Sequence, residues 1–263
     1  MRRNLDLETA VGDVEARFVA ANARSKARFD AALGVMPGAN TRTTLHFDPF
    51  PVTIVAGEGA TLTDLDGHRY TDFLGEYTAG LYGHSNPVIA EAVRDALARG
   101  TVLGGPNTYE ARFAELMCAR FPAVERVRFC NSGTEANLMN LCLARAVTQR
   151  PKIMVMDGGY HGGVLSFANG GSPINAPFEI VLGRYNRTEP TLEALRAHAG
   201  EVAAVILEPM MGAAGCIAAR QDFLETLREE TARHGILLIF DEVMTSRLAV
   251  GGLHERVGVR PDL

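Results

Sequence analysis

Hydrophobic positions in the first third of the chain predict one helix followed by a small antiparallel sheet. In residues 6–33, Ala and Leu alternate with regularly placed Arg, Glu and Asp, which is typical of an amphipathic surface helix. The sequence MPGANTRT at residues 36–43 then interrupts regular structure. Residues 51–73 are β-like, with turns expected at residues 57–59 and 66–67.

Beyond residue 86, the pattern predicts alternating helices and strands. The first helix starts at Asn86-Pro87, an N-cap followed by a proline, and stops at Gly100. Further helices are expected at residues 107–120, 133–147, 189–198 and 222–234, and strands at residues 125–130, 152–156, 179–182, 202–207 and 235–240.

The strand sequences indicate a mostly parallel sheet. VAAVIL (202–207) and ILLIF (236–240) are apolar at every position, which is typical of strands buried on both faces. Right-handed crossovers between such strands give an open, doubly wound α/β sheet. We therefore expect an N-terminal helix and small antiparallel segment at residues 1–75, and a large α/β domain, incomplete at its C-terminus, at residues 76–263.

Composition excludes several classes of protein. The net charge of −5 and the pI near 5.8 leave no basic field for a nucleic-acid partner. No stretch approaches the ~18 consecutive apolar residues of a membrane span. Arg2 and Arg3 are not followed by an apolar segment, so we expect no secretory signal and a cytoplasmic protein. The 4 cysteines lack C-x-x-C pairs, which predicts free thiols and no metal site.

Polar, glycine-rich segments follow four of the expected strands. They are NSGTEAN (131–137), DGGYHGG (157–163), EPMMG (208–212) and DEV (241–243). Ligands of open α/β sheets bind beyond the carboxyl ends of the strands. The sequence therefore predicts a binding site at this edge of the sheet.

The NSGTEAN segment has two interpretations. Ser132 and Glu135 have the spacing of a capping box, in which their side chains satisfy free backbone N–H groups. Alternatively, the positive end of the helix dipole and its free N–H groups hold an anion. Plain caps are common, and this stretch alone leaves both interpretations open.

Asp241 follows a fully apolar strand, where an unpaired carboxylate is costly. A nucleotide-bound Mg²⁺ would need a G-x-x-x-x-G-K-[ST] loop, which the sequence lacks. The remaining partners are a protonated heteroaromatic nitrogen or a neighbouring loop.

Tyr160, between glycines, could stack on a planar ring or pack on the surface, and His161 could pack or hydrogen-bond there. Val243 could press on the other ring face or belong to the core.

These groups together describe pyridoxal 5′-phosphate. Its phosphate would lie at residues 132–134, its ring between Tyr160 and Val243, and its pyridinium nitrogen on Asp241. The motifs SGTEAN, GGYHGG, EPMMG and LLIFDEVMT resemble those of class III (fold type I) pyridoxal-phosphate aminotransferases, in the glutamate-1-semialdehyde aminomutase-like branch. The resemblance runs from about residue 35 to the C-terminus.

This resemblance implies both a site and an assembly. The cofactor-binding residues that it implies are Ser132, Gly133 and Thr134 at the phosphate, Tyr160 stacked on the ring, Glu208 near the ring hydroxyl or its supporting residue, and Asp241 at the ring nitrogen. Members of the family are homodimers with sites at the subunit interface. A homodimer is therefore implied here.

Three segments are most similar to those of β-amino-acid aminotransferases, the β-phenylalanine aminotransferases in particular. They are MPGANTRT, EYTAGLYGHS (76–85) and DEVMTSRLA. In those enzymes the arginine matching Arg42 binds the substrate carboxylate, which a planar guanidinium meets with two parallel hydrogen bonds. The alternative is a solvated loop arginine. Tyr77 is implied near the substrate.

The implied reaction moves an amino group from a β-amino acid to a keto acid such as 2-oxoglutarate. The alternatives are a glutamate-1-semialdehyde 2,1-aminomutase, another class III transaminase, or a non-catalytic fragment.

The implied reaction also needs a lysine that forms a Schiff base with the cofactor and transfers protons. Lys26 is expected on the N-terminal helix, and Lys152 at the start of a strand, away from the site. In the family, the lysine follows shortly after a Pro-Asp-Leu-like segment, which corresponds to Pro261-Asp262-Leu263. We therefore expect the lysine after Leu263 and no catalytic residue within this chain.

Overall fold

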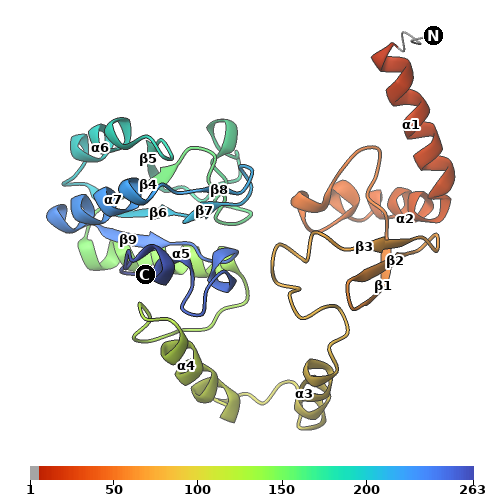
Figure 1. Ribbon diagram of the computed structural model, residues 1–263, viewed down its shortest axis with the longest axis horizontal. Coiled ribbons are helices and arrows are strands. Elements are labelled where there is room, and N and C mark those ends of the chain that lie inside the picture. The colour runs from red at the N-terminus through yellow and green to blue at the C-terminus, as the bar shows by residue number, and fades with distance from the viewer. Residues whose placement is uncertain (1–5) are drawn as a thin grey trace. The chain divides into compact units, whose positions relative to one another are not determined.

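Residues Met1–Val102 and Leu103–Leu263 form two compact units. The structure, a computed structural model, describes residues 6–263 (Figure 1). The first unit contains the helices α1 (Leu7–Ala21), α2 (Ala23–Leu33) and α3 (Pro87–Ala98), and the strands β1 (Ile54–Glu58), β2 (Thr61–Asp64) and β3 (Arg69–Thr71). The domain boundary expected between residues 75 and 76 falls inside this unit.

The helix expected over residues 6–33 is broken at Asn22, so the prediction of a single helix was wrong. The backbone of Asn22 has φ −120° and ψ 42°. Its buried side chain donates through Nδ2 to the carbonyl oxygen of Phe18 at 2.8 Å. An asparagine side chain that binds a nearby backbone group competes with the helical pattern. The chain therefore changes direction between α1 and α2.

The expected N-terminal antiparallel sheet is present, with the strand order β1-β2-β3. Gly59 and Gly67 form its turns with φ angles of 55° and 94°, which glycine adopts readily. In the second turn, the carboxylate of Asp66 accepts hydrogen bonds from the backbone N–H groups of Arg24 and Ser25 at 2.7 and 2.9 Å. These bonds cap the start of α2 and attach the sheet to it.

The second unit is built on a parallel sheet with the strand order β5-β4-β6-β9. Its strands are β4 (Lys152–Met156), β5 (Glu179–Gly183), β6 (Val202–Leu207) and β9 (Leu237–Phe240), and β7 (Met210–Met211) pairs with β8 (Ile217–Ala218) in a short hairpin. Its helices are α4 (Thr108–Arg120), α5 (Gly133–Thr148), α6 (Thr188–Ala197), α7 (Gln221–His234) and α8 (Leu253–Val257).

Helices cover both faces of this sheet, α6 and α7 on one face and α5 on the other (Figure 1). Every residue of β6 is buried. Val205 and Leu207 belong to a core cluster with Leu195 of α6 and Phe223 of α7. Ile206, whose side chain points to the opposite face, belongs to a second cluster with residues of α5. The uniformly apolar strands are therefore buried on both faces, as their sequences predict.

Residues 125–130 form no strand, contrary to the sequence prediction. The edge of β9 is occupied by Leu263, whose N–H donates to the carbonyl of Leu238 at 3.3 Å and whose carbonyl accepts from the N–H of Phe240 at 3.0 Å. Most of residues 125–130 line a cavity of about 920 Å³ together with Phe240 and Leu263. Within residues 6–263 no strand pairs with this segment. A strand-like sequence becomes a strand only where a neighbouring backbone supplies hydrogen bonds.

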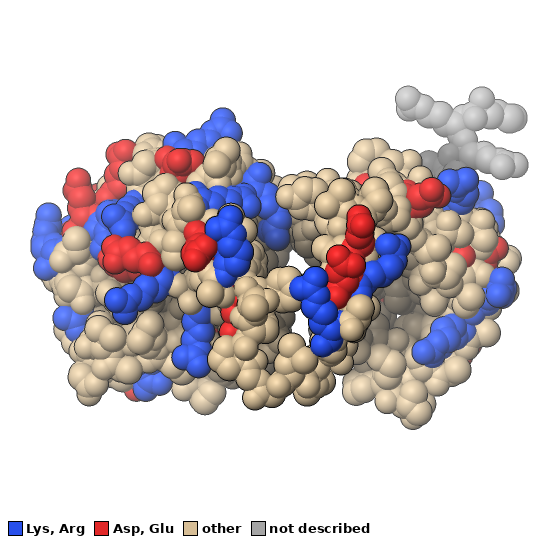
Figure 2. Space-filling view, turned by 90° about the horizontal axis from the view of Figure 1, so that it is seen from below, with Lys and Arg blue, Asp and Glu red and all other residues tan. Residues whose placement is uncertain are grey.

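Basic and acidic side chains are interspersed on the surface of each unit that is seen in Figure 2. The longest helix of the second unit, α5, has 16 residues. Within the part of the chain that the structure describes, no helix combines the length and hydropathy needed to cross a bilayer.

Candidate functional site

Loops meet beyond the carboxyl ends of β4, β6 and β9, at the edge where the sequence predicts a site. The amide of Asn137 in α5 donates to the carboxylate of Asp241 at 2.8 Å and to the carbonyl of His161 at 3.0 Å. The N–H of Tyr160 donates to the carboxylate of Glu208 at 3.1 Å. Segments far apart in the sequence therefore form one hydrogen-bonded cluster.

Asp241 is a buried carboxylate with 8% of its surface exposed. Its Oδ2 atom accepts hydrogen bonds from Asn137 Nδ2 at 2.8 Å and His161 Nδ1 at 2.9 Å, and its Oδ1 atom accepts one from the Val243 N–H at 3.1 Å. Burial alone would raise the pKa of Asp241, but these donors, His161 above all, bring it below its usual value. The carboxylate is thus ionised at neutral pH, and about one of its roughly four lone-pair positions stays open to another donor.

Asn137 is a site residue that sequence analysis missed, and for His161 it left packing and hydrogen bonding open. Because ionised Asp241 has no proton to donate, the imidazole hydrogen of His161 lies on Nδ1. The Nε2 atom of His161 is buried and has no hydrogen-bond partner among the described residues. The one sequence signal for Asn137 is its place as a polar residue on the buried face of a helix, two residues after the SGTE motif.

Glu208 holds two loops by their backbones. Its Oε1 atom accepts from the N–H of Tyr160 at 3.1 Å, and its Oε2 atom accepts from the N–H of Gly212 at 2.9 Å. Burial raises the pKa of Glu208, and the two backbone donors oppose that shift without cancelling it. A Cβ at Gly212 would lie 2.2 Å from the Sδ atom of Met244, so a larger residue there requires the Met244 side chain to move. Glu208 therefore supports the loop of Tyr160.

The start of α5 carries a side-chain cap. Ser132 Oγ accepts from the N–H of Glu135 at 3.1 Å, and Glu135 Oε2 accepts from the N–H of Asn131 at 2.8 Å. The first N–H groups of an α-helix, here including those of Gly133 and Thr134, have no partner inside the helix. The cap uses only part of this set, so a cap and an anion site are compatible.

Two glycines allow three segments to meet at this helix start. A Cβ on Gly133 would lie 2.8 Å from Cγ2 of Val243, and a Cβ on Gly162 would lie 2.1 Å from Oγ1 of Thr134. Gly162 also has a φ of 129°, which other residues rarely adopt. The N–H of Gly163 donates to Thr134 Oγ1 at 3.2 Å. The GGYHGG loop, the start of α5 and the segment after β9 are therefore in direct contact.

Tyr160 and Val243 present their side chains at the surface of this cluster, with 36% and 55% exposed. The backbone of Tyr160 is held by Glu208, and that of Val243 by Asp241. An aromatic and an aliphatic side chain are therefore accessible on loops whose backbones are fixed.

Arg42 and Tyr77 belong to the first unit, and their described contacts lie within it. The guanidinium of Arg42 forms an ion pair with Glu76, and the backbone N–H of Arg42 donates to Oδ1 of Asn40 at 2.8 Å. The hydroxyl of Tyr77 donates to the carbonyl of Thr44 at 3.1 Å. The two residues expected at the substrate therefore lie in one local cluster.

Both lysines of the chain form ion pairs. Lys26 pairs with Asp30 on α2 at 2.6 Å. Lys152, the first residue of β4, pairs with Glu201 at 2.8 Å, at the opposite end of the strand from the GGYHGG loop. Lys152 therefore lies away from the cluster around Asp241.

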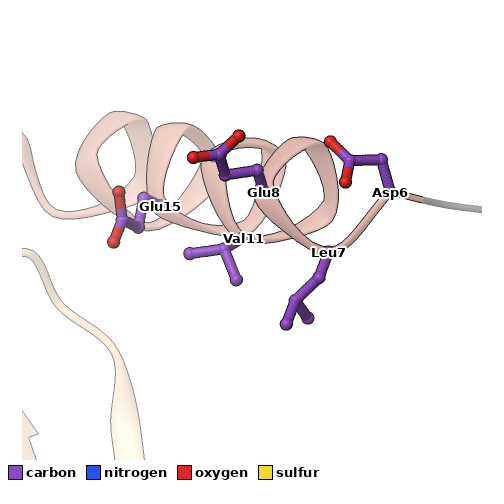
Figure 3. Close-up of a pocket in the computed structure, with 6 residues that line it drawn as sticks. Asp6, Leu7, Glu8, Val11 and Glu15 are labelled. Atoms are coloured by element: carbon purple, nitrogen blue, oxygen red, sulfur yellow. The ribbon is translucent and has the colours of Figure 1, made fainter.

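A shallow, open surface pocket of about 540 Å³ lies along α1 (Figure 3). Its lining residues are Asp6, Leu7, Glu8, Val11, Gly12 and Glu15. Leu7 and Val11 project side by side in the close-up. Carboxylates on a single helix, with no donor side chain among the lining residues, give no basis for assigning a ligand.

Comparison with known proteins adds a family and relatives. The family model Aminotransferase class-III matches residues 44–263. The chain is 51% identical over 257 residues to the β-phenylalanine transaminase of Variovorax paradoxus, a match that covers 98% of this chain and 59% of that protein. It is 38% identical over 263 residues to the glutamate-1-semialdehyde 2,1-aminomutase of Rhodopirellula baltica, covering 93% and 60%. The chain thus spans about three fifths of the length of these curated relatives.

Solved structures share the fold. The crystal structure of a β-phenylalanine aminotransferase from Variovorax paradoxus matches with a TM-score of 0.95 at 50% identity, over 98% of this chain and 60% of that one. A transaminase with PLP bound matches with a TM-score of 0.84 at 36% identity, over 92% and 60%. These matches confirm the fold type I α/β architecture expected from the sequence motifs.

Proposed function

The chain belongs to the class-III aminotransferase family, and from this premise we propose that it forms the cofactor-binding part of a pyridoxal-phosphate aminotransferase that acts on a β-amino acid. The 51% identity to a β-phenylalanine transaminase supports that substrate class. The observation that carries the proposal is Asp241, a buried and ionised carboxylate that accepts three of the roughly four hydrogen bonds it can take. A protonated pyridine nitrogen can donate the remaining one.

The residues around Asp241 fit this cofactor. Residues 132–134 hold its phosphate, because the free N–H groups and the dipole of α5 favour an anion there. Tyr160 and Val243, whose side chains are accessible, would contact the two faces of the ring. When bound, pyridoxal phosphate supplies an electron sink for the negative charge that develops on the substrate carbon when it loses a proton.

The chain's own residues keep that site charged and in position. Asp241 holds a proton on the pyridine nitrogen by opposing its positive charge. His161 and Asn137 fix the orientation of the Asp241 carboxylate through its Oδ2 atom. Glu208 holds the backbone of Tyr160 and so the position of its ring.

Arg42 binds the carboxylate of the substrate through the planar fork of its guanidinium, and Tyr77 lies near that substrate. The amino acceptor is a keto acid, with 2-oxoglutarate as the candidate to be tried first. Glutamate-1-semialdehyde 2,1-aminomutase activity is the second candidate, because relatives of that name match the chain at 38% identity. The Schiff-base lysine, the homodimer and the cytoplasmic location expected from the sequence stay predictions.

A half-reaction assay distinguishes these candidates. A protein that contains this chain together with the expected Schiff-base lysine is loaded with pyridoxal phosphate. It is mixed, without a keto acid, with β-phenylalanine or with glutamate 1-semialdehyde, and the absorbance of the cofactor is followed. Conversion by β-phenylalanine that 2-oxoglutarate then reverses supports the transaminase. If only glutamate 1-semialdehyde converts the cofactor, the activity is that of an aminomutase and the transaminase proposal is wrong. If the protein that carries the lysine gives no absorbance band that borohydride fixes, the chain is a non-catalytic fragment.

A further inference from the structure

Residues 75–78 form a run of left-handed backbone in the first unit. The φ angles are 54° at Gly75, 49° at Glu76, 54° at Tyr77 and 79° at Thr78. Glycine adopts this conformation freely, but each of the three residues that follow incurs a steric cost. Such conformations persist where the surrounding structure holds them, and they cluster at ligand sites.

Hydrogen bonds hold this run on both sides. The N–H of Gly80 donates to the carbonyl of Gly75 at 2.8 Å. The Oδ1 atom of Asp72 accepts from the N–H groups of Leu74 and Gly75 at 2.9 and 3.0 Å, and His84 contacts the other oxygen of Asp72 at 2.9 Å. The left-handed run is therefore fixed by its neighbours.

This backbone directs two side chains to the segment that carries Arg42. The carboxylate of Glu76 pairs with one guanidinium nitrogen of Arg42, Nη1. The hydroxyl of Tyr77 donates to the carbonyl of Thr44 at 3.1 Å. The side chains of Arg42 and Glu76 are 50% and 45% exposed, so their ion pair is weak and an anion in solution can reach it.

We propose that Glu76 is a positioning residue for Arg42, which it holds in place until a substrate carboxylate displaces it. The inference rests on the proposed role of Arg42 in substrate binding. An incoming carboxylate meets the negative charge of Glu76, and this repulsion weakens its binding. The guanidinium has five N–H donors, and Glu76 engages one nitrogen, so the exchange can begin before the ion pair breaks. Glu76 therefore weakens the binding of carboxylates that contact Arg42 alone and favours ligands that make further contacts elsewhere.

The test measures the dissociation constant of 3-phenylpropanoate, a carboxylate without an amino group, by calorimetric titration of the full chain. Glu76→Gln removes the charge and keeps the size of the side chain. We expect it to tighten binding about two- to five-fold, the range for loss of an exposed charge pair. The neutral amide 3-phenylpropanamide should bind equally well to both proteins. Glu91→Gln, which removes an equal charge from the exposed surface of α3, should leave the constant unchanged.

The outcomes separate this inference from the proposed function. If the wild-type chain does not bind 3-phenylpropanoate, or if Arg42→Ala binds it equally well, the role of Arg42 fails and the inference fails with it. If Arg42→Ala weakens binding but Glu76→Gln leaves it unchanged or weaker, only the inference is overturned. A second measurement needs no variant: the ¹³C signal of the Glu76 carboxyl group in the wild-type chain should shift at saturation. An unmoved signal also overturns the inference.

Discussion

The Nδ1 atom of His161 lies 2.9 Å from the Oδ2 atom of Asp241, and both side chains are buried. This pair joins the loop after β4 to the loop after β9. Because His161 and Asn137 lower the pKa of Asp241 against the effect of burial, the carboxylate is charged before any ligand arrives. The electrostatic property that the proposed cofactor requires is therefore built into the protein.

Replacement of Asp241 should weaken pyridoxal phosphate binding. We expect Asp241→Asn to raise the Kd about tenfold or more, since a hydrogen bond to a charged group contributes about 1.5–3 kcal/mol. The Kd is measured from the cofactor's absorbance after equilibrium dialysis. Asp157→Asn changes an exposed aspartate in the GGYHGG loop region and is the matched control. Equal retention by the Asp241 variant and the control would contradict the cofactor assignment.

Replacement of His161 should raise the pKa of Asp241. In His161→Phe the largest opposing influence is lost, so burial dominates and the pKa of the carboxyl moves upward. A ¹³C NMR titration of the Asp241 carboxyl group follows the change directly. His198→Phe, at a partly exposed histidine paired with Glu201, is the control and should leave the titration of Asp241 unmoved. An unchanged titration in the His161 variant would remove this residue from the charge balance of the site.

Gly162→Ala should open the contact between the GGYHGG loop and α5. Its Cβ would lie 2.1 Å from Thr134 Oγ1, and its φ of 129° is strained for alanine. We expect a loss of about 2 kcal/mol or more in the free energy of unfolding, together with weaker cofactor binding. Gly163→Ala is the control, because nothing lies within 4 Å of its Cβ position. Urea unfolding followed by circular dichroism compares the two variants, and equal stabilities would show that the loop yields.

Asp64 should make the first unit sensitive to acid. Burial would raise the pKa of Asp64, but hydrogen bonds from Tyr70 and His68 hold it at about 2. An unfolded aspartate has a pKa of about 3.9, so the Asp64 carboxylate stabilises the fold fully above that pH. The contribution is lost as the pH falls from about 4 to about 2.

Asp64→Asn tests this pH dependence. The variant should show a flatter dependence of unfolding free energy on pH across the same acid range, because it has no carboxylate there to protonate. Asp95→Asn, at an exposed position of α3, should keep the wild-type slope. Parallel slopes for the Asp64 variant and the wild type would show that this carboxylate does not couple to folding.

Much of the second unit could be predicted from its sequence because its signals are local. The strand of residues 202–207 is apolar at every position and is buried at every position. Asn107 caps α4 as its spacing predicts, and in the first unit Asn86 caps α3 in the same way. The motifs around Asp241 also indicated the family correctly, since the class-III model matches residues 44–263.

Two of the differences between prediction and structure concern partners that are distant in the chain, and a third concerns a local side-chain contact. Residues 125–130 have the composition of a strand, but pairing depends on a neighbouring backbone. The hydrogen bond from Asn137 to Asp241 spans 104 positions, which no local spacing rule reaches. The break at Asn22 depends on a side chain turned back to Phe18, which amphipathic periodicity does not report.

The two backbone hydrogen bonds that Glu208 accepts have a consequence for protein engineering. Because its two oxygens hold main-chain N–H groups, the anchoring of the GGYHGG loop does not depend on which side chain stands at position 160, proline excepted. A library at that position can therefore vary the aromatic surface while the loop keeps its course. Diversity introduced at position 208 would instead release both loops together.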